Sequence, residues 1–390
     1  MPSSTSSSDP GGARPDDAAP APEAPVPAPA RAADDVVLRR IPDVRWSAAA
    51  LLAVAVAVLG LGAWEAYWRV AQQVVPSYMN SDGQWAEARR RLDRSEPNAT
   101  AFIGSSRTQF DIDLDVWEEL TGVHGVQLAL EGSNPLPILT DIADDEDFRG
   151  LLVVGITPPL VLMPGIGSRA EALERYYEES PSQWLGTKLS FLLEPRLAFY
   201  NWDFALFTVL ARQPWWPDRP GLAVDAAEVR KIENMRRDRQ ADMWNRVEDD
   251  PEFNAKVTST WQAIVESLPP PPPPEEAQKA FEAKLAQISE DVARIRARGG
   301  EVVFIRPPSS DWFREFEREA TPRDRVWEPI LDAADAIGVH FEDDPALSDV
   351  KTPEWSHISS RDKARWTRAL VEILRARMAE RGVHRPEIGS

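Results

Sequence analysis

The chain has 390 residues, enough for one large domain with an insertion or for two smaller domains, besides terminal segments. Its 63 acidic residues outnumber 44 basic ones, and the formal net charge of −19 argues against a nucleic acid partner and favours a solvated, repelling surface. Because the chain has no cysteine, its stability must come from an ordinary core and not from disulfides.

The N-terminal segment is rich in Pro, Ala, Ser and Asp, and residues 1–35 have almost no large apolar side chains. Such a segment cannot bury enough surface to offset the entropy lost on ordering. We therefore expect residues 1–45 to form a disordered tail.

A charge-free apolar run follows at residues 46–64. At about 1.5 Å per residue it spans roughly 28 Å, close to the thickness of the hydrocarbon core of a bilayer. Aromatic residues, which favour the headgroup level, stand at both ends: Trp46 on one side and Trp64, Tyr67 and Trp68 on the other. The sequence predicts a single transmembrane anchor at 46–68 that ties the protein to a bilayer.

Basic residues are unevenly distributed around this anchor. Arg39, Arg40 and Arg45 precede it, whereas only Arg69 closely follows it. The positive-inside rule then predicts a cytoplasmic N-terminus and an extracytoplasmic C-terminal region. A cleaved secretion signal fits less well, because the region before the apolar core is long and no convincing small-residue cleavage site follows. A buried helix of a soluble protein would need a polar face, which this run lacks.

Beyond a linker and helix at 69–97, five short apolar runs bounded by turn residues predict strands at 100–103, 125–130, 151–156, 301–306 and 339–342. Leu114 to Leu120 have a helical pattern, with Asp113 as the N-cap and Gly122 as the stop. Strand, helix and strand at this spacing are typical of parallel βαβ units, and an α/β sandwich follows.

The last predicted element is a helix whose apolar stripe should pack on the sheet. Ser359 is expected to cap its start, with Asp362 three residues later, and Gly382 to end it before a tail at 383–390. The stripe consists of Trp366, Leu370, Ile373, Leu374 and Met378.

A different pattern separates the two halves of the predicted sandwich, which are residues 98–157 and 300–382. Residues 158–299 contain helical stretches at 176–207 and 226–268, then six prolines at 269–274 that predict a stiff polyproline linker, and a helix at 275–298. We interpret this segment as one long helical insertion. Its tryptophans are interpreted as core residues, with a substrate groove or a partner surface as the alternative; they include Trp184, Trp202, Trp215 and Trp216.

Two polar motifs stand at points where function collects in open parallel sheets. Gly104-Ser105-Ser106-Arg107 follows the first strand, and Glu354-Trp355-Ser356-His357 precedes the last helix. A serine and a histidine so placed suggest a nucleophile and a base that the fold brings together. The plainer alternative is a hydroxyl-rich turn and a polar loop histidine, which each motif alone would also fit.

In their longer form, Ile103 to Phe110 and Glu354 to Ser359, these motifs resemble the first and last blocks of the SGNH (GDSL-like) hydrolase superfamily. The resemblance covers roughly residues 98–381 without the insertion. It implies a three-layer sandwich with a parallel sheet, in which Ser106 is the nucleophile, His357 the base and Glu354 the orienting carboxylate.

General chemistry supports the same roles. A serine hydroxyl is a poor nucleophile and needs an adjacent base, and imidazole titrates near neutral pH. A carboxylate bonded to the far ring nitrogen fixes the tautomer and stabilises the imidazolium. Glu354 lies three residues from His357, close enough for that contact on a turn, and Asp349 is the reserve candidate.

The resemblance also implies an oxyanion hole made by the backbone N–H groups of Ser106 and Gly132, and by an asparagine after the third strand. Here that strand is followed by Gly155-Ile156-Thr157-Pro158, which lacks the asparagine, and Asn134 of the neighbouring loop is the proposed substitute. Ser105 and Glu354 also replace the aspartates that are usual in their blocks.

We therefore expect a membrane-anchored serine esterase or O-acyltransferase that acts on an acyl group, most plausibly acetyl, of an extracytoplasmic polysaccharide. The alternative is a non-catalytic SGNH-like module that binds glycan or docks on a membrane O-acyltransferase. No cofactor is expected, and no histidine pair or carboxylate cluster has the spacing of metal ligands.

Overall fold

A computed structural model describes residues 45–95, 99–165, 167, 169–213, 231–385 and 388. The predicted N-terminal tail, except for Arg45, lies outside the described residues, as do Trp215 and Trp216.

One long apolar helix opens the described chain. Helix α1 (Trp46–Ala66) continues into the π-helical turn η1 (Tyr67–Ala71), and no side chain of α1 is buried. By length and composition this is the one helix among the described residues that could cross a membrane. The predicted anchor at 46–68 is therefore a continuous helical segment.

Five strands form one fully parallel sheet with the order β2-β1-β3-β6-β7. This order is that of a doubly wound sheet, in which the winding reverses between β1 and β3. The carboxyl ends of those two strands are the expected place for a site. The strands are β1 (Thr100–Ile103), β2 (Val126–Gln127), β3 (Leu151–Gly155), β6 (Glu301–Arg306) and β7 (Ile337–His340).

The predicted strands lie close to the observed ones. The second is shorter than predicted, although the N–H groups of Leu128 and Leu130 still bond to the carbonyls of Phe102 and Gly104. The last strand begins and ends two residues earlier than predicted. It ends at His340 because Phe341–Asp343 turn into the 3-10 helix η4, where the N–H of Glu342 bonds to the ring of His340.

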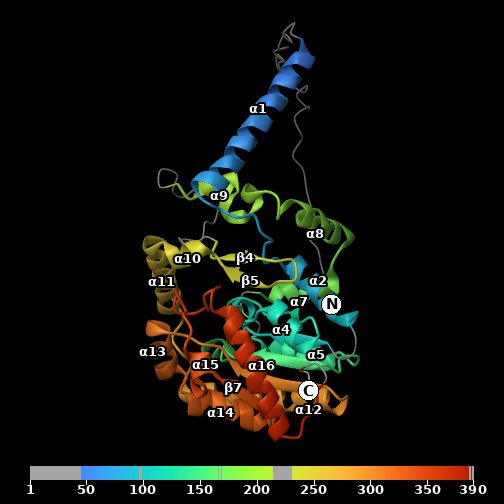
Figure 1. The fold of residues 1–390 in the computed structure, drawn as a ribbon, viewed down its shortest axis with the longest axis vertical. Coiled ribbons are helices and arrows are strands. Elements are labelled where there is room, and N and C mark those ends of the chain that lie inside the picture. The colour runs from blue at the N-terminus through green and yellow to red at the C-terminus, as the bar shows by residue number, and fades with distance from the viewer. Residues whose placement is uncertain are drawn as a thin grey trace, which may run out of the picture. The chain divides into compact units, whose positions relative to one another are not determined.

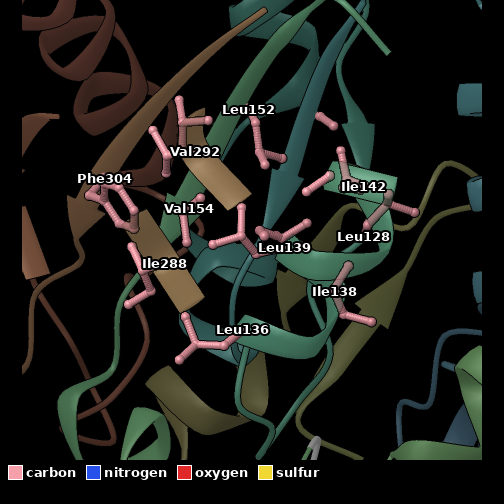
Figure 2. Packing of buried hydrophobic residues seen from close by; sticks show 14 of the residues in the cluster. Leu128, Leu136, Ile138, Leu139, Ile142, Leu152, Val154, Ile288, Val292 and Phe304 are labelled. Atoms are coloured by element: carbon pink, nitrogen blue, oxygen red, sulfur yellow. The ribbon is translucent and has the colours of Figure 1, made fainter. Parts of the chain in front are cut away.

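Both faces of the sheet carry a hydrophobic core, because successive strand side chains point to opposite faces. On one face, strand residues such as Leu152 and Val154 pack against Leu139 and Ile288 (Figure 2). On the other face, Phe102 and Val153 belong to a separate cluster with Trp117 and Trp366. Helices therefore cover both sides of the sheet, and the fold is a mixed α/β sandwich. The first face is covered by α2 (Asp82–Asp93), α5 (Leu136–Asp144), α12 (Pro274–Ala297) and α14 (Arg323–Ala334), and the second by α4 (Leu114–Thr121) and α16 (Lys363–Glu380).

The ends of α4 agree with the prediction, whereas the start of α16 does not. The Asp113 carboxylate accepts hydrogen bonds from two N–H groups of the first turn of α4, and Gly122 ends it with φ +74°. Helix α16 begins only at Lys363, and Ser359 is not its cap. The Ser359 hydroxyl accepts the N–H of Arg361 at 3.2 Å, in the turn before the helix, and donates to Glu248, 2.8 Å away.

The segment predicted as a helical insertion contains a β-hairpin as well as helices. Residues 226–268 were expected to be helical, but β4 (Glu233–Met235) and β5 (Ala241–Met243) form an antiparallel pair. Their turn contains Arg239, which has φ +74° and a buried guanidinium bonded to the carbonyls of Gln127 and Ala129. The helical parts are α6 (Pro158–Val161), α7 (Ala170–Glu178), α8 (Pro181–Leu193), η2 (Ala198–Tyr200), η3 (Trp202–Phe204), α9 (Leu206–Ala211), α10 (Asn245–Asp249) and α11 (Pro251–Glu266).

Helix α12, which the sequence placed at the end of that insertion, packs on the sheet through residues such as Ile288 and Val292. Figure 1 shows α12, α14 and α16 arranged around the strands. The remaining elements are α3 (Ser106–Asp111) after β1, α13 (Asp311–Ala320) after β6, and α15 (Pro345–Ser348) after η4.

Candidate active site

Helix α3 lies unusually close to the ends of β1 and β3. Gly104 ends β1 and Gly155 ends β3, and a Cβ atom on either glycine would overlap the side chain of Thr108. The two glycines therefore make room for α3 at the point where the winding of the sheet reverses. Ser106 is the first residue of α3, and it is the one residue from Gly104 to Asp111 that is not buried.

His357 and Glu354 form a buried pair on the loop before α16. The Nδ1 atom of His357 lies 2.9 Å from Oε1 of Glu354, and the backbone N–H of His357 donates to the same oxygen at 2.7 Å. Burial alone would raise the pKa of Glu354, but the charge of the His357 ring and the hydrogen bonds outweigh it, and the pKa is lowered. An ionised carboxylate thus holds the imidazole, as the sequence predicted for these two residues.

The insertion supplies a residue that hydrogen-bonds to the Glu354–His357 pair. Trp261 on α11 donates its indole N–H to Oε2 of Glu354 at 2.6 Å. The turn that carries the pair is also strained, because Trp355 has φ +74°, a value uncommon for a bulky residue and typical of functional sites.

Three contacts pack α3 directly against this loop. The Phe110 ring stacks on the His357 ring with centroids 4.2 Å apart. Arg107 donates from Nε to the hydroxyl of Ser356 at 3.1 Å, and Asp111 accepts the backbone N–H of Ile358 at 2.9 Å. Ser106 lies one turn before Phe110 on the same face of α3, because residues four apart are neighbours on a helix. The predicted nucleophile and base therefore belong to two segments that contact each other.

The Nε2 atom of His357 is buried, and no hydrogen-bond partner for it is found among the described residues. Buried polar atoms are nearly always paired, so an unpaired one at a candidate site calls for a functional explanation. It is the nitrogen that a general base would use, because Nδ1 is already held by Glu354.

A buried ion network fixes the other side of α3. Arg107 lies 2.7 Å from Glu317, and Glu317 also pairs with Arg306 at 2.5 Å and accepts a hydrogen bond from Ser309 at 2.7 Å. Burial would raise the pKa of Glu317, but the two guanidinium groups outweigh it and lower the pKa to about 2. Glu317 is therefore an anion that ties α3 to β6 and α13.

Asp111 has the opposite electrostatic character. Burial raises its pKa well above the ordinary value, and the nearby Glu354 carboxylate raises it further. Its Oδ1 atom accepts from Ile358, whereas Oδ2 is buried without a partner among the described residues. Asp111 thus contributes a hydrogen bond to the loop, and burial disfavours its charged form.

Two of the three predicted oxyanion-hole residues, Gly132 and Asn134, occupy one loop after β2, and the third, Ser106, begins α3. Gly132 has φ +60°, which favours glycine, and its N–H makes no hydrogen bond to a described residue. Asn134 is buried, and its amide donates to the carbonyl of Met163 at 3.1 Å while its oxygen accepts from the N–H of Leu136 at 3.1 Å. One of the two amide hydrogens of Asn134 is therefore already committed.

Two departures from the SGNH motifs meet in the structure. Ser105, at the usual aspartate, and Thr157, in the block that lacks the asparagine, share a buried hydroxyl–hydroxyl hydrogen bond of 2.7 Å. A neutral pair links the ends of β1 and β3 at this point.

The reserve candidate and the other histidines lie outside this constellation. Asp349 is exposed, with Arg365 4.0 Å away, and has no contact with His357. His124 is paired with Glu118 near the surface. His340 is buried, and its pKa is lowered to about 3 by burial and by nearby arginines. Among the described residues, no group of three potential metal ligands is found.

Four residues of the site were given no role from the sequence. Arg107 and Phe110 stand inside the first motif, and Asp111 directly follows it, but nothing in their spacing indicates a contact with a loop so far along the chain. Trp261 is a tryptophan in a helix of the insertion, where a core position was the expectation. These four residues are identified only by the contacts that α3 and α11 make with the loop before α16.

Comparison with protein-family models, with curated proteins and with solved structures finds no match for this chain, so the chemistry of the site must be derived from its own residues.

Proposed function

We propose that the protein is a membrane-anchored serine esterase or O-acyltransferase, with Ser106 as nucleophile, His357 as base and Glu354 as orienting carboxylate. The observation that carries the proposal is the buried Glu354–His357 pair, which leaves Nε2 unpaired and stacks on Phe110, one turn from Ser106 on α3. Such an arrangement has no evident structural purpose, because a buried unpaired nitrogen costs stability.

The proposed reaction requires the Ser106 hydroxyl to reach Nε2 of His357, which has no hydrogen bond to a described residue in the structure. The Ser106 Oγ atom attacks the acyl carbonyl while His357 Nε2 takes the hydroxyl proton, and Glu354 stabilises the imidazolium. The N–H groups of Ser106 and Gly132, with the remaining amide hydrogen of Asn134, would stabilise the oxyanion. His357 then returns the proton to the leaving alcohol, which departs and leaves an acyl-Ser106 ester. Water resolves this ester in an esterase, and a sugar hydroxyl resolves it in a transferase.

The proposed substrate class, an extracytoplasmic polysaccharide, rests on the expected location of the site. An anchor with arginines on its N-terminal side favours an extracytoplasmic site, and such a location favours a surface glycan over a metabolite as the acyl carrier. The resemblance to anchored SGNH-like proteins of polysaccharide acetylation points to the same substrate, with acetyl as the acyl group, by analogy of fold and motif.

The test is hydrolysis of an aryl acetate by the full chain in detergent. Ser106→Ala and His357→Ala should each lower kcat by about a thousandfold, because members of such a triad act as a unit. Matched controls are Ser289→Ala on the exposed face of α12 and His124→Ala at the surface, which should retain activity. Equal rates for the wild type and both triad variants would reject the enzyme.

A second candidate is a non-catalytic module that binds glycan or docks on a membrane O-acyltransferase. The observation that favours it is the Ser105–Thr157 pair in the block that lacks the oxyanion asparagine. The two candidates differ in their reaction with a fluorophosphonate probe. An enzyme is labelled at Ser106 and a binding module is not, because only an activated serine reacts readily.

A further inference from the structure

The surface of two insertion helices is strongly apolar where an ordinary soluble domain would be polar. On α8, Leu185, Leu189 and Leu192 recur at helical spacing and each is more than half exposed. Residues Trp202 and Phe207 are 62% and 72% exposed. We call these residues, with Trp184 and Leu206, the α8–α9 surface. The prediction that Trp184 and Trp202 are core residues is therefore wrong.

This exposure is a property of one side of α8 and not of a poorly packed helix. On its other side, Phe191 is buried with its ring edge against Tyr78 at 5.7 Å, and the buried Thr187 lies against Gly83 of α2. Serine 180 caps the helix with a complete capping box. A well-anchored helix with an exposed row of leucines is built to contact something apolar.

The segment between α8 and α9 is fastened to the end of the apolar helix α1. The indole N–H of Trp64 donates to the carbonyl of Phe204 at 3.2 Å, and the rings of Trp68 and Phe204 lie 4.6 Å apart. The Glu65 carboxylate accepts the N–H groups of Ala198 and Phe199 at 2.9 and 3.1 Å. The α8–α9 surface is thus continuous with the residues that close the candidate membrane span.

That position selects the kind of partner. Trp64 and Trp68 are aromatic residues at the end of an apolar span, where rings favour the headgroup level. Phe204, which contacts both tryptophans, is therefore expected at the headgroup level too. Lys188 on α8 has its ammonium 5.5 Å from the ring centre of Trp184 and 2.6 Å from the carboxylate of Glu87 on α2, so its charge is paired on the side of α8 that faces the domain. Leucine, tryptophan and phenylalanine exposed on one face are typical of a helix that lies in a lipid interface.

We propose that the α8–α9 surface is a second membrane contact, which lies in the headgroup–acyl boundary of the bilayer that α1 enters. Its burial in lipid would strengthen the membrane binding that α1 provides, because a surface tethered by α1 meets the membrane at high effective concentration. It would also fix the orientation of the exported domain toward the membrane. The proposal is independent of the catalytic function, since none of these residues belongs to the candidate active site.

The absence of cysteine makes a direct test simple. Single variants Leu189→Cys and Phe207→Cys of the full chain are labelled with an environment-sensitive fluorophore and reconstituted in nanodiscs, one protein per disc. Ser289→Cys on the exposed face of α12 is the matched control. Lipids carrying a quencher near the headgroup should lower the emission at 189 and 207 by about twofold or more and leave 289 unchanged, since interfacial helices sink roughly 5–10 Å into the boundary.

Two results would overturn the proposal. Quenching at 189 and 207 no stronger than at 289 would mean that the surface faces water. A water-shielded emission without quenching by lipid would mean that another protein or a second copy covers it. Neither result depends on activity, so the esterase proposal stands or falls separately.

Discussion

Trp261 of the insertion and Glu354 of the C-terminal loop share a hydrogen bond of 2.6 Å, although they are 93 positions apart in the chain. The bond satisfies the carboxylate oxygen that His357 does not contact. The insertion is thus part of the candidate active site and not an appendage to it.

Trp261→Phe should lower kcat for an aryl acetate by about tenfold, because it leaves a buried carboxylate oxygen unpaired and loosens the carboxylate that orients His357. The measurement is kcat and KM across pH, with Trp184→Phe on the α8–α9 surface as the control. Since Glu354 would lose one of the hydrogen bonds that lower its pKa, activity should fall away at a higher pH on the acid side. An unchanged acid limb and an unchanged kcat would show that the bond is only structural.

Asp111→Asn and Asp111→Ala should separate the hydrogen bond of this residue from its charge. The asparagine keeps an acceptor for the N–H of Ile358, so its Tm should match that of the wild type below the ordinary Asp pKa of 3.8, where the carboxyl is protonated in both the folded and the unfolded state. The alanine leaves that buried N–H unpaired and should lose about 1–3 kcal/mol.

The pH dependence of this comparison has a definite sign. The pKa of Asp111 is raised in the folded state, so its contribution is full below the ordinary value of 3.8 and is lost as pH rises through the folded pKa. Thermal unfolding from about pH 5 to about pH 9 should therefore move in favour of Asp111→Asn as pH rises. A difference that shrinks with pH would contradict the assignment.

Glu317→Gln should be strongly destabilising at neutral pH, by about 3 kcal/mol or more, because Arg107 and Arg306 would lose their shared buried anion. The lowered pKa of Glu317 stabilises the fold above the ordinary value of 4.5, and this stabilisation is lost as pH falls toward about 2. Denaturant unfolding of both proteins should show the gap closing over that window. A gap that stays constant with pH would mean that packing and not charge explains the loss.

Ile288→Ala should cost about 2–5 kcal/mol, because the side chain is fully buried on the sheet and its removal leaves a cavity. The neighbouring Ser289→Ala is exposed on α12 and should change stability little. The measurement is the free energy of unfolding of each variant. Equal stabilities would show that α12 is not part of the sandwich core.

Much of the sandwich could be predicted because its signals are local. Strands β1 and β6 are short apolar runs, and α4 carries its own cap at Asp113 and its own stop at Gly122. Glu354 and His357 are also local partners, three residues apart on one turn, so their contact could be expected from spacing alone.

The predictions that failed concern residues whose partners lie far along the chain. The sequence predicts Ser359 as the cap of the last helix, but the helix begins later and the Ser359 hydroxyl donates a hydrogen bond to Glu248. The hairpin β4–β5 is held by Arg239, whose guanidinium donates to the carbonyls of Gln127 in β2 and of Ala129 just after it, and no periodicity in residues 226–268 encodes these contacts. Trp184 and Trp202 read as core because apolar residues usually are buried, and their exposure becomes intelligible only beside the end of α1.

The contacts between α3 and the loop at 354–358 have a consequence for the synthesis of the protein. Arg107, Phe110 and Asp111 emerge early in synthesis, whereas Ser356, His357 and Ile358 emerge among the last residues. If the proposed roles hold, a chain interrupted anywhere in the insertion would carry Ser106 without His357 and would have no esterase activity. Under the proposed function, activity would therefore begin only after the C-terminal loop has been synthesised and has packed on α3.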